Sequence, residues 1–171
     1  MNPIILDEVF DKKTHSFIMK ELSLTPSETI YWEENRSRTI STYNRYSKFS
    51  NILLPLAREI FNDKEILPSY ALWARYFGAG GYLEKHKDNN ACTFTIDYCV
   101  NQFEPWPIFI EGEEYILEKN QALCFMGEDQ EHWRTEWKPG NVVDMMFFHY
   151  VRPDHWWYTG DGGIYQFKNN H

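Results

Sequence analysis

The chain has 171 residues, a length that suits one domain built around one core. Hydrophobic residues make up 43% of it and aromatic residues 18%, which is enough apolar material to form that core without disulfides or a structural metal. The formal net charge of −8 argues against a general affinity for nucleic acid or anionic membranes, because such a surface repels phosphate groups.

The cysteines and the first residues of the chain indicate in which cellular compartment the protein is expected. Cys92, Cys99 and Cys124 form no CxxC motif and lie in apolar runs, where reduced cysteines behave as small hydrophobic residues. The first residues, MNPIILDEVFDKK, lack the basic start and long apolar stretch of a secretory signal, and no run approaches the roughly 20 apolar residues of a membrane span. We therefore expect a cytoplasmic protein in a reducing environment.

The first part of the chain has mainly helical patterns. Residues 11–22 and 48–62 space their apolar side chains helically, and each range predicts a short helix. Pro55 lies inside the second range, so that helix either starts near this proline or is kinked there. Residues 29–34 have strand character. We expect residues 1–68 to flank a core formed by the rest of the chain.

From residue 69 onward, short β-rich runs follow one another and are separated by turns that contain Gly, Asn and Pro. The predicted strands cover residues 69–77, 91–100, 107–112, 113–117, 122–126 and 141–151. Several short strands at this spacing indicate a sandwich or a closed barrel, and the lack of βαβ alternation argues against a Rossmann-type sheet. We expect one mainly β domain over residues 1–171, with its core at 69–152 and an aromatic tail at 153–171 wrapping over it.

A candidate metal site begins with His86-Lys87-Asp88 near a strand end. In an extended segment, residues i and i+2 point to the same face, so His86 and Asp88 can reach one ion. A third ligand has to come from elsewhere, and His132, after several further strands, is the candidate. Two histidines and one carboxylate on one face of an iron ion leave three positions open for a co-substrate and O₂. An HxD triplet alone carries little weight, because chance produces it often.

Two stretches around these residues resemble a known family. RYFGAGGYLEKHKDNNACTFTIDYCVN resembles the metal-binding strand of the 2-oxoglutarate/Fe(II)-dependent dioxygenases, in their prolyl-4-hydroxylase-like branch. ALCFMGEDQEHWRTEW resembles the strand that delivers the distal histidine in that branch. The interval between His86 and His132 fits the few strands that the family places between its ligands. The resemblance covers roughly residues 70–152.

The resemblance implies a fold and an activity. The family's fold is a double-stranded β-helix, a jelly-roll barrel, here with flanking N-terminal helices. His86, Asp88 and His132 would be the metal-binding and catalytic residues, with Fe(II) as the metal, 2-oxoglutarate as the co-substrate and O₂ as the oxidant. The implied reaction decarboxylates 2-oxoglutarate to succinate and CO₂ and hydroxylates a C–H bond of a small-molecule or peptidyl substrate. Because Asp88 is retained, we expect hydroxylation, or a desaturation that uses the same oxidant, rather than halogenation.

One departure from the family pattern concerns the co-substrate. The family places an Arg or Lys about ten residues after the distal histidine, where this chain has Asn141, Val142 and Val143. A buried carboxylate needs a partner, so another cation would have to substitute. The candidates are Arg134, which shares the strand parity of the distal histidine, and Arg75 on the strand before the HxD loop. We favour Arg134.

Other residues and readings stay open at this stage. The family uses a tyrosine near the HxD loop to bind the co-substrate, and Tyr76 and Tyr82 are candidates, although both also suit ordinary packing. We favour His149 as a core or surface histidine whose hydrogen bonds are made within the protein, rather than as a metal ligand. One face of the strand at 93–100 has to look into the pocket, and the sequence does not say which. The alternatives to the oxygenase are a cupin-like metal enzyme that does not use 2-oxoglutarate and a non-catalytic barrel that binds a ligand.

Overall fold

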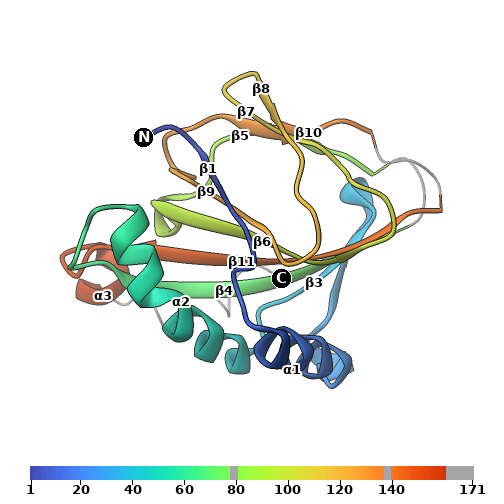
Figure 1. The fold of residues 1–171 in the computed structure, drawn as a ribbon, viewed down its shortest axis with the longest axis horizontal. Coiled ribbons are helices and arrows are strands. Elements are labelled where there is room, and N and C mark those ends of the chain that lie inside the picture. Colours follow the sequence, from blue (N-terminus) through green and yellow to red (C-terminus); the bar gives the residue numbers. More distant parts are fainter. Residues whose placement is uncertain (78–80, 137–139, 161–171) are drawn as a thin grey trace.

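The computed structural model describes residues 1–77, 81–136 and 140–160, so most of the expected tail lies outside the described residues. Two antiparallel β-sheets face each other, and helices cover the outer face of the larger sheet (Figure 1). Facing antiparallel sheets of this kind form a jelly roll, and the predicted mainly β fold class is confirmed. None of the helices in the described ranges is long and apolar enough to cross a membrane.

The larger sheet has seven strands. Their order is β1 (Ile4–Leu6), β9 (Ala122–Phe125), β6 (Phe94–Gln102), β11 (Val142–Val151), β4 (Leu67–Phe77), β3 (Arg38–Ser41) and β2 (Tyr31–Glu33). The smaller sheet has four strands, in the order β5 (Leu83–His86), β10 (His132–Arg134), β7 (Ile108–Ile110) and β8 (Glu113–Tyr115). The N-terminal part therefore contributes strands to both edges of the larger sheet, in addition to its helices.

Two longer helices pack beneath the larger sheet (Figure 1). They are α1 (Lys12–Ser23) and α2 (Ser47–Ile60), and a short α3 (Trp156–Thr159) follows the last strand. Both predicted helices are confirmed, and of the two alternatives for Pro55, a helix that starts near this proline is wrong. Pro55 lies inside α2, because Phe49 and Leu53 bury their side chains in the core and hold the segment before the proline helical.

The shorter helical turns occupy connections. They are η1 (Ser27–Thr29), η2 (Glu34–Arg36), η3 (Asn44–Tyr46) and η4 (Asn90–Cys92). The strand expected at 91–100 consequently starts later, at Phe94, because η4 uses the residues before it. Asn89 caps that turn by accepting a hydrogen bond from the Ala91 N–H at 2.9 Å.

Strand β6 shows which face of the larger sheet looks into the barrel. One set of alternating side chains packs with the helices: Phe94, Ile96, Tyr98 and Val100. The other set, which includes Thr95, Asp97 and Cys99, therefore points toward the smaller sheet. In β4 the same alternation places Tyr76 on the inner face and Trp73 on the helix side.

Candidate metal centre

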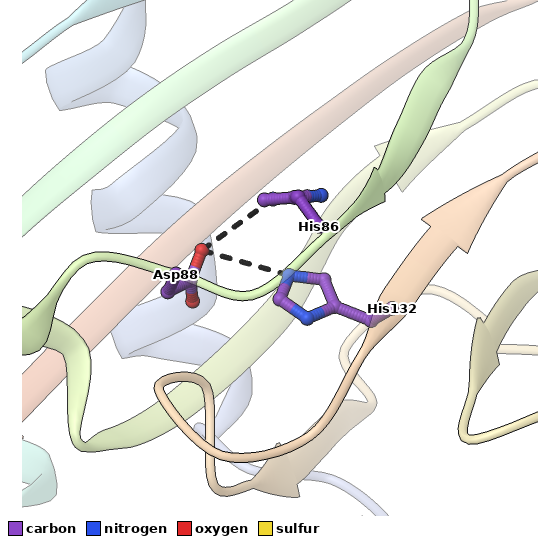
Figure 2. A group of neighbouring side chains, drawn as sticks. All are labelled: His86, Asp88 and His132. Atoms are coloured by element: carbon purple, nitrogen blue, oxygen red, sulfur yellow. Dashed lines mark ion pairs between the residues drawn. The ribbon is translucent and has the colours of Figure 1, made fainter.

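The pairing of two short strands brings the histidines together. His86 on β5 and His132 on β10 are direct partners across the ladder, and their ring centroids are 4.2 Å apart. Asp88 lies just beyond β5, where its backbone N–H donates to the Gly127 carbonyl at 2.9 Å. Its Oδ1 atom lies 3.6 Å from His86 Nε2 and 3.5 Å from His132 Nε2 (Figure 2). The three predicted ligands thus converge on one point, and their donor atoms form a group that could hold a metal ion.

Backbone carbonyls orient both imidazole rings. His86 Nδ1 lies 2.8 Å from the Glu84 carbonyl oxygen, and His132 Nδ1 lies 2.9 Å from the Gln130 carbonyl oxygen. A carbonyl only accepts hydrogen bonds, so each Nδ1 carries a proton and donates it. In the neutral ring the Nε2 lone pair then faces Asp88, which is the arrangement that metal-binding histidines need. The donor set therefore fits a divalent ion such as iron(II).

The electrostatics of the cluster also suit a cation. Burial by itself would raise the pKa of Asp88, but hydrogen bonds from His132 and His86 outweigh it and hold that pKa far below the usual range. Burial would lower the pKa of His132, and the partnership with Asp88 reverses this and raises it. The position between His132 and Asp88 therefore favours positive charge.

We expect metal affinity to fall as the pH falls. An ion has to displace the proton of His132, whose raised pKa makes this competition begin above the ordinary histidine range. Below that pKa, each displaced proton weakens binding by about tenfold per pH unit. Calorimetric titration of the metal-free protein with cobalt(II) at pH 6 and pH 8 measures the effect. Equal affinity at both values would contradict a role for His132 as a ligand.

A glycine makes room for the carboxylate. A Cβ atom added at Gly127 would collide with Asp88 Oδ2 and with Thr95 Oγ1, and it would lie 2.7 Å from the Cys92 carbonyl oxygen. Only glycine therefore allows the chain after β9 to pass this close to Asp88 and to accept its backbone hydrogen bond.

We expect Gly127→Ala to weaken cobalt(II) binding by at least about tenfold while the barrel stays folded, because the methyl group pushes Asp88 away from the histidines. Calorimetry gives the affinity and circular dichroism checks the fold. Gly112→Ala is the matched control: Gly112 has φ +92° and no atom within 4 Å of an added Cβ, so this variant loses stability and keeps its metal affinity. The reverse pattern would show that Gly127 does not position the ligand.

A second layer of polar side chains lies behind Asp88. Thr95 Oγ1 lies 3.5 Å from Asp88 Oδ2 and 3.1 Å from His149 Nδ1. His149 is buried against the ring of Tyr70, with centroids 4.6 Å apart, and burial lowers its pKa to about 4. His149 also forms a second group of ligand-type atoms with Asp88 and Cys92. It is therefore a neutral neighbour of the cluster that sequence reasoning left out of the site.

Arg134 lies beside the cluster with part of its hydrogen-bonding capacity unused. It follows His132 on the same face of β10, and only 3% of it is exposed. Its Nη1 donates to the Trp106 carbonyl, and the guanidinium lies 4.9 Å from the centroid of the Trp106 ring. Nε and Nη2 have no hydrogen-bond partner among the residues that the structure describes. Unpaired buried donors on a cation are costly, so the arrangement favours an anionic ligand.

The other predicted co-substrate contacts lie differently. Arg75 is on the helix side of the larger sheet, where Nε and Nη2 bind the two oxygens of Asp144 at 2.9 and 3.0 Å. Tyr76 is buried on the inner face, and its hydroxyl accepts a hydrogen bond from Arg38 at 2.6 Å. Tyr82 is 46% exposed before β5. The structure thus brings Arg134 and Tyr76 to the inner face and places Arg75 on the opposite face of the sheet.

Asp97 is a site neighbour that the sequence analysis did not single out. It is buried on the inner face of β6, near Arg134 and the histidines. Burial raises its pKa to about 7, although the charges of Arg134 and His132 oppose this. The strand alternation contained a clue, because Asp97 shares a face with Thr95. The sequence could not show that this face points into the barrel, because only the packing of the helices identifies the opposite face as core.

We expect Asp97→Asn to stabilise the metal-free protein at high pH. In the unfolded chain this carboxyl ionises near its usual pKa of about 4, whereas the folded protein keeps the proton up to about pH 7. Folding of the wild type is therefore penalised progressively as the pH rises between these values, by about 2–4 kcal/mol once the group is ionised in both states. Urea unfolding at pH 4 and pH 8 should show the advantage of the variant at pH 8 only.

The control for this prediction is a carboxyl group whose pKa is shifted in the opposite direction. A hydrogen bond from Arg152 lowers the pKa of Asp63, so its favourable contribution is present above the unfolded pKa and is lost as the pH falls. Asp63→Asn should therefore lose a little stability at pH 8. An advantage of Asp97→Asn that is equal at both pH values would contradict a titrating Asp97.

Known proteins resemble this chain in fold and not in sequence. No protein-family model matches the chain, and no curated protein matches its sequence. An oxidoreductase of the 2OG-Fe(II) oxygenase family from Burkholderia pseudomallei aligns with a TM-score of 0.70 and 10% identity, over 88% of this chain and 85% of that chain. HygX from Streptomyces hygroscopicus, with nickel, 2-oxoglutarate and hygromycin B bound, aligns with a TM-score of 0.69 and 9% identity, over 89% and 83%.

A third match comes from the branch that the sequence resembles. A prolyl-4-hydroxylase from Pseudomonas putida aligns with a TM-score of 0.61 and 12% identity, over 88% of this chain and 92% of that chain. At these identities the likeness concerns the fold. The resemblance predicted from the sequence is confirmed at that level: the chain has the fold of the 2-oxoglutarate/Fe(II) oxygenases, including prolyl hydroxylases.

Proposed function

We propose that the protein is an Fe(II)- and 2-oxoglutarate-dependent oxygenase that hydroxylates a C–H bond. The observation that carries the proposal is the juxtaposition of three metal-ligand side chains with a buried arginine, two of whose nitrogens have no partner among the described residues. A metal site alone suits many chemistries, and a buried cation alone suits many anions. Together they match a co-substrate that binds a metal at one end and a cation at the other.

The three ligands have separate tasks in this proposal. His86 and His132 offer Nε2 lone pairs, and Asp88 offers Oδ1 as a carboxylate at any physiological pH. When bound, the iron supplies the redox chemistry that couples oxidation of 2-oxoglutarate to oxidation of the substrate. The protein holds the ligands on one side, and the buried inner faces of the sheets exclude water from the other. Because Asp88 would occupy the third ligand position, that position would not be available to a halide ion.

Arg134 would bind the distal carboxylate of 2-oxoglutarate. Nε and Nη2, which have no partner in the part of the chain that the structure describes, can donate to both carboxylate oxygens at once. Tyr76, on the same inner face, would support this end of the co-substrate. Arg75 is committed to Asp144 on the far side of the sheet, and the exposed Tyr82 is a weaker candidate.

The solved structures with this fold support the proposal by analogy. HygX was solved with nickel and 2-oxoglutarate bound, and another match is a prolyl hydroxylase in complex with a peptide fragment from Trichoplax adhaerens. Those ligands belong to those proteins. They make metal, 2-oxoglutarate and a small-molecule or peptidyl substrate reasonable choices for this chain as well.

One observation favours a second candidate, a metal-dependent enzyme that does not use 2-oxoglutarate. Asp97 lies near Arg134 and interacts with it electrostatically. If an ion at the cluster keeps Asp97 ionised, this carboxylate offsets part of the charge of Arg134, and the need for a co-substrate carboxylate becomes weaker. A cupin-like enzyme would then fit the same barrel.

Anaerobic titration separates these candidates. Iron(II) is added to the metal-free protein with and without 2-oxoglutarate, and the charge-transfer absorption of the ternary complex is followed. The oxygenase proposal predicts this absorption, and it predicts succinate once O₂ is admitted. Iron binding without the absorption and without succinate favours the cupin-like enzyme, and failure to bind iron(II) favours a non-catalytic barrel.

A further inference from the structure

A cleft of about 900 Å³ lies along β2, β3 and β4, toward one edge of the larger sheet, and extends to the residue next to Asp88. Its wall includes Asn89, the residue that follows Asp88 in the chain. It also includes Tyr70, whose ring packs on His149 and whose hydroxyl lies 3.0 Å from Cys92 Sγ. The cleft thus adjoins the residues behind Asp88, and its volume is within the range of sites that hold drug-sized molecules.

The N-terminal part of the chain builds the outer wall of this cleft. Tyr31 comes from β2, Ile40 from β3, and Tyr43 and Asn44 from the segment that leads into α2. These residues lie before residue 69, outside the stretch whose sequence resembles the oxygenase family. The N-terminal part therefore contributes much of the lining that decides what the cleft can accept.

Aromatic rings and neutral polar groups dominate the lining. The aromatic residues are Tyr31, Trp32, Tyr43, Tyr70 and Trp157. Hydroxyl and amide side chains lie between them, among them Thr42, Asn44 and Asn89. Flat aromatic faces pack well against the C–H faces of saturated rings, while hydroxyl and amide groups both donate and accept hydrogen bonds.

The charged groups in the lining neutralise each other. They are Glu33 and Arg38, and Arg38 Nε lies 2.5 Å from Glu33 Oε2. Arg38 also donates to the hydroxyl of Tyr76, and Glu33 lies 3.9 Å from Arg36 Nη1. A free amino acid or another ionic ligand would have to break this pairing to find a counter-charge among the described lining residues. An uncharged ligand leaves the pairing intact.

We propose that this cleft binds a neutral, polyhydroxylated small molecule of the sugar or glycoside class as the substrate. Its rings would lie against the aromatic side chains, and its hydroxyls would exchange hydrogen bonds with the Thr, Ser and Asn side chains. The chemical step rests on the proposed function: one oxygen atom of O₂ converts a C–H bond of the sugar to C–OH, and the other enters succinate as 2-oxoglutarate loses CO₂. Binding in the cleft does not rest on it.

The test measures binding without metal or co-substrate. Saturation-transfer NMR on the metal-free full chain uses a pool of neutral di- and trisaccharides that includes maltotriose, lactose and raffinose. The counter-probes are the cationic glucosamine trimer and a blocked prolyl tripeptide amide. We expect transfer to the neutral sugars and little to either counter-probe. Because iron and 2-oxoglutarate are absent, a failed oxygenase assay does not affect this outcome, and failed sugar binding leaves the oxygenase proposal standing.

Variants locate the binding. Tyr31→Ala removes one aromatic wall and is expected to weaken sugar binding at least tenfold, and Thr42→Trp fills the cleft and should abolish it. Phe103→Ala is the control, because Phe103 is 81% exposed and does not line the cleft. The proposal is overturned if no neutral sugar binds, if the prolyl peptide binds in their place, or if Tyr31→Ala and Thr42→Trp, with unchanged melting temperatures, bind like wild type.

Discussion

Replacing His132 with alanine is expected to weaken iron(II) binding by at least about a hundredfold and to abolish succinate formation, with the barrel still folded. The variant leaves His86 and Asp88 as a two-residue site, because the Nε2 atom that lies 3.5 Å from Asp88 Oδ1 is gone. Removing a supporting residue of a metal site typically costs 10–100-fold in affinity, and removing a ligand costs more. Calorimetry with cobalt(II) under anaerobic conditions measures the metal affinity, and circular dichroism checks that the barrel is folded. Succinate formation is measured with iron(II).

His149→Ala is the matched control for this experiment. His149 is also a buried histidine near Asp88, but it lies in the second layer and contacts Thr95. We expect this variant to bind metal more weakly by a smaller factor, since it only loosens the support of Asp88. Wild-type affinity in His132→Ala together with a large loss in His149→Ala would move the metal to the second group of ligand-type atoms, which His149 shares with Asp88 and Cys92.

Replacing Arg134 with alanine is expected to raise the 2-oxoglutarate concentration needed for half-maximal activity by one to two orders of magnitude. The loss corresponds to roughly 1.5–3 kcal/mol of charged hydrogen bonding. Iron binding should persist, because Arg134 holds no ligand in place through any contact among the described residues. Succinate formation as a function of 2-oxoglutarate concentration gives the dependence, and cobalt(II) calorimetry checks the metal site.

Arg75→Ala is the comparison that decides between the two arginines. It breaks the pair with Asp144 on the helix side of the sheet, so we expect some loss of stability and an unchanged 2-oxoglutarate dependence. The opposite result, with normal dependence in Arg134→Ala and a large loss in Arg75→Ala, would mean that the co-substrate binds elsewhere. A normal dependence in both variants would favour an enzyme that does not use 2-oxoglutarate.

The local patterns of the sequence predicted the main elements because each pattern depends on residues that are close together in the chain. Helical spacing located α1 and α2, and the spacing i, i+2 located the pair His86 and Asp88 on one face. The alternation in β6 was equally clear, yet it could not say which face was the core. That answer depends on where the helices pack, and helix packing is a property of the whole fold.

The parts of the site that the sequence did not predict depend on contacts between distant residues. Arg75 and Asp144 are 69 positions apart, so their pairing, which removes Arg75 from consideration, is invisible before the strands are placed side by side. Gly127 looks like an ordinary turn glycine until Asp88 and Thr95 are seen against it. Asp97 reads as one more polar residue in a strand, and burial beside Arg134 is what gives it an unusual pKa.

The position of β5 at the edge of the smaller sheet has a mechanical consequence. This strand has four residues, and β10 is its only neighbour among the described strands, so few backbone hydrogen bonds hold it in place. An ion shared by His86 and His132 would join the two strands through their side chains and close a loop of the intervening chain. The metal would then link this edge strand to the rest of the smaller sheet, so that loss of the ion and opening of the site become a single event.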